Sequence, residues 1–169
     1  AAVKFVLRQL KTTTDDIYCI YINCWKKDSN YKIELDICEQ LGYKWTHNKR
    51  TDEIMKTIEE IINRKSAVIV LDEVDKVNDI DILYSLAEDL SRKSLILVAN
   101  DKEWVSKLDH RVKSRLNLEL IEFKSYNYDE TRGIMKIRRD YAFVPNVWNE
   151  DSFDLVANKT YESKDRGSH

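Results

Sequence analysis

"AVIVLDEVDK" (residues 67–76) is the stretch of sequence that decides the fold. An unbroken apolar run from Ala67 to Leu71 is followed at once by the carboxylates Asp72 and Glu73. A short apolar run rich in β-branched residues predicts a strand that is buried in a parallel sheet. Such a strand would deliver both carboxylates to its carboxyl end.

The rest of the chain alternates between strand-like and helix-like patterns. Residues 17–24, 94–101 and 116–123 have strand character. Apolar residues recur at helical spacing between these runs, over residues 3–10, 32–43, 51–65 and 79–93. Strands that alternate with helices predict an α/β fold, in which a parallel sheet has helices on both faces.

Polar residues mark where several of these elements begin. Thr51 precedes an amphipathic pattern and is a candidate N-cap. Strand patterns stop at about residue 125, and Asn127 with Glu130 then forms the sequence pattern of a capping box. We therefore expect an α/β domain and the beginning of an all-helical domain, over residues 1–124 and 125–169.

Composition excludes several classes of function. The chain has 28 basic and 30 acidic residues, so any binding of nucleic acid needs a local basic patch. No apolar run approaches the roughly 20 residues of a membrane helix, and no membrane partner is expected. Cys19, Cys24, Cys38 and His47 lack the close spacing of a zinc site, which favours buried free thiols in a reducing compartment.

Glycine is too scarce for a phosphate-binding loop. Gly42, Gly133 and Gly167 are the three glycines, and the pattern G-x-x-x-x-G-K-[ST] cannot be written anywhere in the 169 residues. A strand that ends in Asp-Glu normally serves such a loop earlier in the chain. The sequence therefore contains half of an ATP site.

The residues at the expected strand ends are suited to phosphate chemistry. In parallel sheets the chemistry collects at the carboxyl ends of the strands, where Asp72, Glu73 and Asn100 fall. Asp72 can hold Mg²⁺ through water, Glu73 can polarise the water that attacks a γ-phosphoryl group, and Asn100 can position that water. The alternatives are a solvated acidic turn and a turn-forming asparagine. Residues 108–117 can supply an arginine finger, or are a solvated basic turn.

Four stretches, taken in order, resemble one family. "VIVLDEVDKV", "LVANDKEW", "LDHRVKSRL" and "IEFKSYNYDE" look like the Walker B, sensor 1 and box VII motifs and the lid entry of AAA+ replication initiators. They are most similar to those of the archaeal origin-recognition proteins, and the resemblance covers residues 1–143. It implies an AAA+ P-loop NTPase core with a helical lid, and ATP or ADP and Mg²⁺ as cofactors.

The resemblance also assigns roles to single residues. Asp72 resembles the magnesium-coordinating aspartate, Glu73 the catalytic glutamate and Asn100 the sensor 1 residue. Arg115 lies where related clamp loaders place the arginine finger, and Arg111 is the alternative.

Both ends of the chain depart from the family pattern. The family's phosphate loop ends immediately before the helix that residues 1–10 resemble. We therefore expect a fragment without the first strand and the loop, which neither binds nor hydrolyses ATP by itself. Arg166 is a candidate for the lid's second sensor arginine, but "RGSH" (166–169) also resembles the start of a histidine tag.

Basic residues interleaved with aromatic ones form a candidate DNA surface. "CWKKDSNYK" (24–32) and "YKWTHNKR" (43–50) lie where the family carries an insertion that touches duplex DNA. We expect Lys44, Lys49 and Arg50 to contact DNA, because cations suit phosphate contact and aromatic rings suit stacking. The alternative is that the lysine stems cover an apolar surface.

These observations predict the ATPase core of a replication initiator that binds duplex origin DNA. Its expected partners are other initiator subunits and the replicative helicase. Its expected location is the nucleoid in the cytoplasm of an archaeon, or the nucleus of a eukaryote. The alternatives are a clamp-loader-like or signalling AAA+ ATPase and a non-catalytic scaffold subunit.

Overall fold

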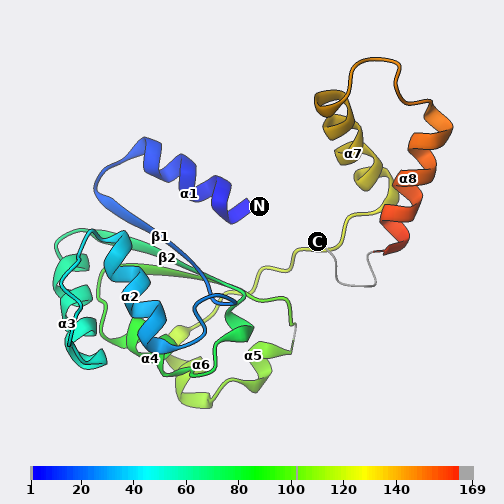
Figure 1. Cartoon of the computed structure of the whole chain (residues 1–169). Coiled ribbons are helices and arrows are strands. Elements are labelled where there is room, and N and C mark those ends of the chain that lie inside the picture. Colours follow the sequence, from blue (N-terminus) through cyan, green and yellow to red (C-terminus); the bar gives the residue numbers. More distant parts are fainter. Residues whose placement is uncertain (1, 102, 164–169) are drawn as a thin grey trace. The chain divides into compact units, whose positions relative to one another are not determined.

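The protein consists of two compact units, Ala1–Glu119 and Leu120–His169. A computed structural model describes residues 2–101 and 103–163 (Figure 1). Arg166 therefore lies outside the described residues.

A parallel sheet forms the centre of the first unit. Its strands are β1 (Ile17–Asn23), β2 (Ser66–Asp72) and β3 (Lys93–Val98), in the order β1-β2-β3. Both pairings are parallel, which confirms the predicted sheet. The decisive apolar run is thus the central strand.

Helices cover both faces of the sheet, as predicted. Helix α1 (Ala2–Thr13) lies on one face, and α2 (Asn30–Gln40), α3 (Thr51–Ile62) and α4 (Asp81–Glu88) lie on the other (Figure 1). The following short helices are α5 (Trp104–Lys107) and α6 (His110–Leu116).

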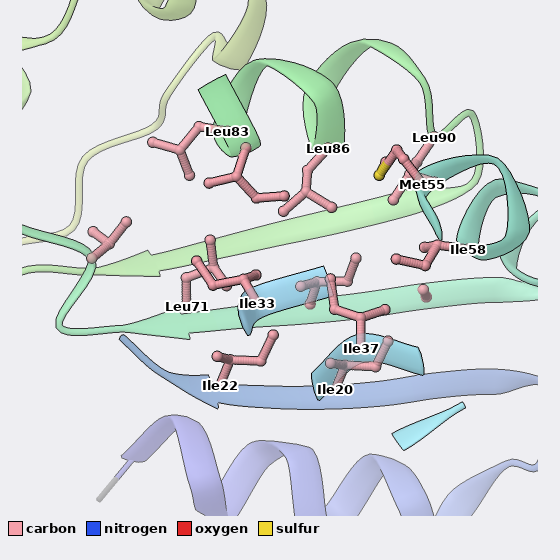
Figure 2. Close-up of a cluster of buried hydrophobic side chains, with 14 of the residues drawn as sticks. Ile20, Ile22, Ile33, Ile37, Met55, Ile58, Leu71, Leu83, Leu86 and Leu90 are labelled. Atoms are coloured by element: carbon pink, nitrogen blue, oxygen red, sulfur yellow. The ribbon is translucent and has the colours of Figure 1, made fainter. Parts of the chain in front are cut away.

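Strand β2 contributes to a core on each face because successive side chains of a strand point in opposite directions. Ile69 and Leu71 belong to the larger core under α2, α3 and α4, part of which Figure 2 shows. Val70 packs with Leu7 of α1 in the smaller core. All three side chains are fully buried, so the centre of this strand needs apolar residues on both faces.

The outer edge of β1 is covered by a side chain. Gln40, the last residue of α2, bonds both backbone groups of Tyr21: Nε2 donates to the carbonyl at 2.9 Å, and Oε1 accepts from the N–H at 3.1 Å. Unpaired backbone groups on an edge strand invite pairing with other chains. Gln40 therefore helps to end the sheet at β1.

Three sequence-based expectations about individual elements were wrong. The N-cap of α3 is Arg50 rather than Thr51, and the Glu53 carboxylate accepts the Arg50 N–H at 2.9 Å. Helix α4 is shorter than the predicted 79–93, because the chain leaves the helix at Asp89 and the next residue, Leu90, is buried in the core.

The third wrong expectation is the strand at 116–123. Residues 117–127 form no strand, and the apolar side chains of Leu120, Ile121 and Phe123 are exposed. Alternating apolar residues are compatible with a strand, but a strand also needs a neighbour that supplies ladder hydrogen bonds. Among the described residues the sheet contains only β1, β2 and β3.

The second unit contains two helices, α7 (Tyr128–Ala142) and α8 (Glu150–Glu162). Arg132 and Arg139 of α7 both pair with Glu150 of α8, each at 3.1 Å. The predicted capping box is confirmed: Asn127 Oδ1 accepts the Glu130 N–H, and a Glu130 carboxylate oxygen accepts the Asn127 N–H, each at 2.8 Å. No helix in the described ranges has the length and apolar character that crossing a bilayer requires.

Removing the cap should loosen the start of α7. We expect Asn127→Ala to cost about 1 kcal/mol, because the Glu130 N–H loses its acceptor. Amide hydrogen exchange in the first turn of α7 should then be about fivefold faster, the equivalent of that energy. Asn158→Ala, at an exposed position inside α8, is the matched control and should have little effect. Equal changes in both variants would contradict the capping role.

Candidate functional site

The carboxyl ends of the three strands form one row of residues. The parallel register aligns Asn23 of β1 with Asp72 of β2, and Asp72 with Val98 of β3. The Cys24 N–H donates to the Asp72 carbonyl at 2.8 Å, which extends the ladder past the end of β1. Asp72 therefore lies at the centre of the edge where the chemistry of parallel sheets collects.

Hydrogen bonds from two sides fix the Asp72 carboxylate. The Tyr21 hydroxyl donates to Oδ2, and the Glu73 N–H donates to Oδ1 at 3.1 Å. Burial, together with the hydrogen bond to Asp72, raises the pKa of Tyr21, so its hydroxyl stays protonated and remains a donor. A carboxylate has about four acceptor positions, so Asp72 can still accept from metal-bound water.

Glu73 has a left-handed backbone, with φ 57° and ψ 43°. This conformation costs a non-glycine residue on the order of 1 kcal/mol, and such strain is often found at functional sites. The short turn Val74–Lys76 follows, and the fully buried Val74 anchors it. The half-buried Glu73 is thus held at the end of β2 by its neighbours.

Asp75 connects the end of β2 to the end of β3. Its Oδ1 accepts the Asn100 N–H at 3.3 Å, and its Oδ2 pairs with Lys76 at 2.8 Å. Burial acts to raise the pKa of Asp75, but the hydrogen bonds from Lys76 and Asn100 outweigh it and hold the pKa below its ordinary value. The exposed Asn100 is therefore tied by its backbone to the same turn as Glu73.

The two candidate finger arginines lie on α6 and have partners within the chain. Arg115 pairs with Glu88 at the end of α4 at 3.2 Å. Arg111 pairs with Asp109, the N-cap of its own helix, at 3.3 Å. The side chain of Arg111 is 85% exposed and that of Arg115 is 53% exposed.

The predicted DNA-binding cations lie in the loop that leads into α3, and they differ in how many side-chain partners hold them. Lys49 donates to the Tyr43 hydroxyl at 2.7 Å and to Thr57 Oγ1 at 3.2 Å, and the hydrogen bond to Tyr43 raises its pKa. Arg50 is mostly exposed beside Asp52 at 3.5 Å. Lys44 is also exposed, and so is the ring of its neighbour Trp45.

The described residues contain no cluster of three or more histidine, cysteine or acidic side chains arranged to hold a metal ion directly. Cys19, Cys24 and Cys38 are buried free thiols. Burial and the nearby Asp72 raise the pKa of Cys24 to about 12, so it remains a neutral thiol. The hard carboxylate oxygens of Asp72 and Glu73 suit Mg²⁺ held through its water shell, which needs few protein ligands.

The sequence identified Asp72, Glu73 and Asn100, and the structure brings them to one edge. The sequence did not identify Tyr21 and Asp75 as members of this edge. The only signal for Asp75 was its place three residues after Asp72, and Tyr21 reaches Asp72 across 51 residues of sequence. Such a contact depends on the strand register.

Residues 3–103 match the family model described as "AAA domain". An ORC1-type DNA replication protein of Sulfurisphaera tokodaii is 37% identical to the chain over 93% of the chain and 42% of the relative. One from Thermoplasma acidophilum is 31% identical over 93% of the chain and 42% of the relative. The chain thus spans less than half the length of these relatives.

Solved structures share this fold. The Aeropyrum pernix ORC1 protein in complex with DNA superposes with a TM-score of 0.81 at 27% identity, over 94% of this chain and 45% of that one. Cdc6p of Pyrobaculum aerophilum has a TM-score of 0.82 at 19% identity, over 92% of this chain and 44% of that one. The second likeness concerns the fold alone.

Proposed function

The chain belongs to the AAA domain family and resembles its archaeal ORC1-type members, and we propose that it is part of an ATP-regulated initiator that binds origin DNA. The observation that carries this proposal is the grouping of Asp72, Glu73 and Asn100 at the carboxyl edge of an AAA-type sheet. Relatives named as replication proteins favour an initiator over a signalling ATPase or a scaffold. Such a protein would act at the chromosome.

The three edge residues would have different roles in ATP hydrolysis. Asp72 would hold Mg²⁺ through water, and the Tyr21 hydroxyl would keep its carboxylate in place. Mg²⁺ neutralises the charge that develops on the phosphate oxygens. Glu73 would accept a hydrogen bond from the attacking water, and the Asn100 amide would orient that water.

A second initiator subunit would receive an arginine from α6. Arg115 keeps this assignment, and it would have to exchange its Glu88 partner for a γ-phosphate. Arg111 is the alternative because more of its side chain is exposed. Nucleotide-dependent contacts of this kind would also govern the proposed assembly with the helicase.

The DNA surface would be the loop before α3. We assign phosphate contact to Lys44 and Arg50, with Trp45 available for stacking against the sugar or base edges. Lys49 belongs to the same surface, but its bonds to Tyr43 and Thr57 indicate that it mainly fixes the loop.

Duplex DNA binding across a salt series tests the proposal. The full-length gene product should bind origin-like DNA, with a log–log salt slope that becomes shallower by about two in the Lys44→Gln/Arg50→Gln variant. Adding Lys49→Gln should bring the change to at most about three. The series is run with ADP and with ATP, because the nucleotide should change the affinity.

A matched control removes one lysine and one arginine elsewhere. Arg8 and Lys11 are exposed on α1, and Arg8→Gln/Lys11→Gln should leave the slope unchanged. An unchanged slope in the Lys44/Arg50 variant would remove the loop from the DNA surface. ATP binding without any DNA affinity would point instead to a clamp-loader-like or signalling ATPase.

A further inference from the structure

A cavity of about 660 Å³ lies between α2, α3 and α4. It is separate from the carboxyl-edge residues, none of which lines it. Met55 of α3 and Ile82 of α4 give it an apolar part, and both belong to the larger core. Most of its other lining residues are polar or charged.

Glu34 and Asn30 line this cavity, and each has a buried side-chain oxygen, Oε2 and Oδ1, without a hydrogen-bond partner within the described part of the chain. Glu34 is 2% exposed. The Asn30 amide is oriented, because its Nδ2 donates to Asp79 Oδ2 at 2.7 Å and leaves the oxygen free to accept. Buried acceptors without partners are costly, so the cavity favours a ligand that donates hydrogen bonds.

The charges around the cavity favour a cation. Asp81 of α4 and Asp89, which directly follows α4, contribute carboxylates to its lining. Helix α3 contributes two further carboxylates, Asp52 and Glu59. Lys56 of the same helix and its N-cap residue Arg50 contribute two cations. With Glu34 included, acidic groups outnumber basic ones. Burial, and after it the charge of Asp52, raises the pKa of Glu34 to about 7, and an arriving cation would favour its ionised form.

A single metal ion fits this arrangement poorly, since the described acidic side chains do not converge on one point. We propose that the cavity binds an alkyl guanidinium or ammonium group, which donates to Glu34 and Asn30 while its stem packs on Met55 and Ile82. A guanidinium is the better fit because its planar fork can donate to two acceptors at once. The group could come from an arginine or lysine side chain of a partner protein, or from a free polyamine.

Agmatine, a butyl chain with a guanidinium at one end and an ammonium group at the other, is the probe. Titrated calorimetrically into the 169-residue chain at pH 7, it should bind at least about tenfold more weakly to Glu34→Gln, which loses a charge-assisted hydrogen bond. Glu60→Gln, an exposed position on α3 outside the cavity, is the matched control and should bind as the unmodified chain does. N-butylurea, a neutral molecule that lacks both the guanidinium and the ammonium group, should not bind.

Proton release gives a second readout. Agmatine binding should release a proton from Glu34 near pH 7, so the binding enthalpy should vary with the ionisation enthalpy of the buffer, and this variation should vanish in Glu34→Gln. Binding of N-acetyl-arginine amide as well as agmatine would support a protein side chain as the source. Binding of agmatine and spermidine alone would support a free cation. Absence of binding, or binding that Glu34→Gln leaves intact, would overturn the proposal.

Discussion

Glu73→Gln is expected to reduce ATP turnover by the full-length gene product at least about 100-fold while ATP binding persists. The amide keeps the size of the side chain but accepts a proton far less readily, so it cannot polarise the attacking water. The fold should be unaffected, because glutamine meets the same left-handed backbone at this position as glutamate does. ATP should therefore stay bound for longer than in the unmodified protein.

Single-turnover hydrolysis and nucleotide retention check this prediction. Glu60→Gln makes the same chemical change at an exposed position on α3 and should keep normal turnover. Asp72→Asn should instead weaken Mg²⁺-dependent ATP binding, because its carboxylate lies at the centre of the strand row. If Glu73→Gln kept more than about a third of the normal turnover, Glu73 would not be the group that activates the water.

The sheet could be predicted because its signals are local. The apolar run ending at Leu71 is buried on both faces, and a run of this kind is compatible with few positions other than a central parallel strand. The carboxyl-edge grouping followed from the same argument, since parallel strands bring their carboxyl ends together. The capping box at Asn127 spans four residues and could be predicted for the same reason.

Features that depend on distant partners could not be predicted. Residues 116–123 have a strand-like pattern, but no neighbouring strand within the described chain pairs with them. The hydrogen bonds from Lys49 to Tyr43 and Thr57 span only six and eight residues, but they form only once the loop folds against α3, and DNA contact by Lys49 stays a prediction. No local pattern indicates that Glu34 is buried, because its burial depends on how α2 packs against α3 and α4.

Burial of Glu34 should make the first unit less stable as the pH rises. The pKa of this carboxyl is raised from 4.5 to about 7 in the folded chain, chiefly by burial. Below pH 4.5 both the folded and the unfolded chain hold the proton, and its contribution to stability is fully present. As the pH rises through about 7 that contribution is lost, because the unfolded chain ionises first. The loss in the free energy of unfolding amounts to about 3 kcal/mol.

Glu34→Gln separates this effect from all other titrations, because glutamine stays neutral at every pH. In urea unfolding followed by tryptophan fluorescence, the variant should gain about 3 kcal/mol over the unmodified chain between pH 4.5 and pH 8. Asp75 should not obscure the effect, since its lowered pKa affects stability only in more acidic solution. Glu60→Gln should show no such gain. The difference in stability between Glu34→Gln and the unmodified chain could instead be the same at both pH values. That result would mean that Glu34 is already ionised in the folded protein and that a partner stabilises its charge despite its burial.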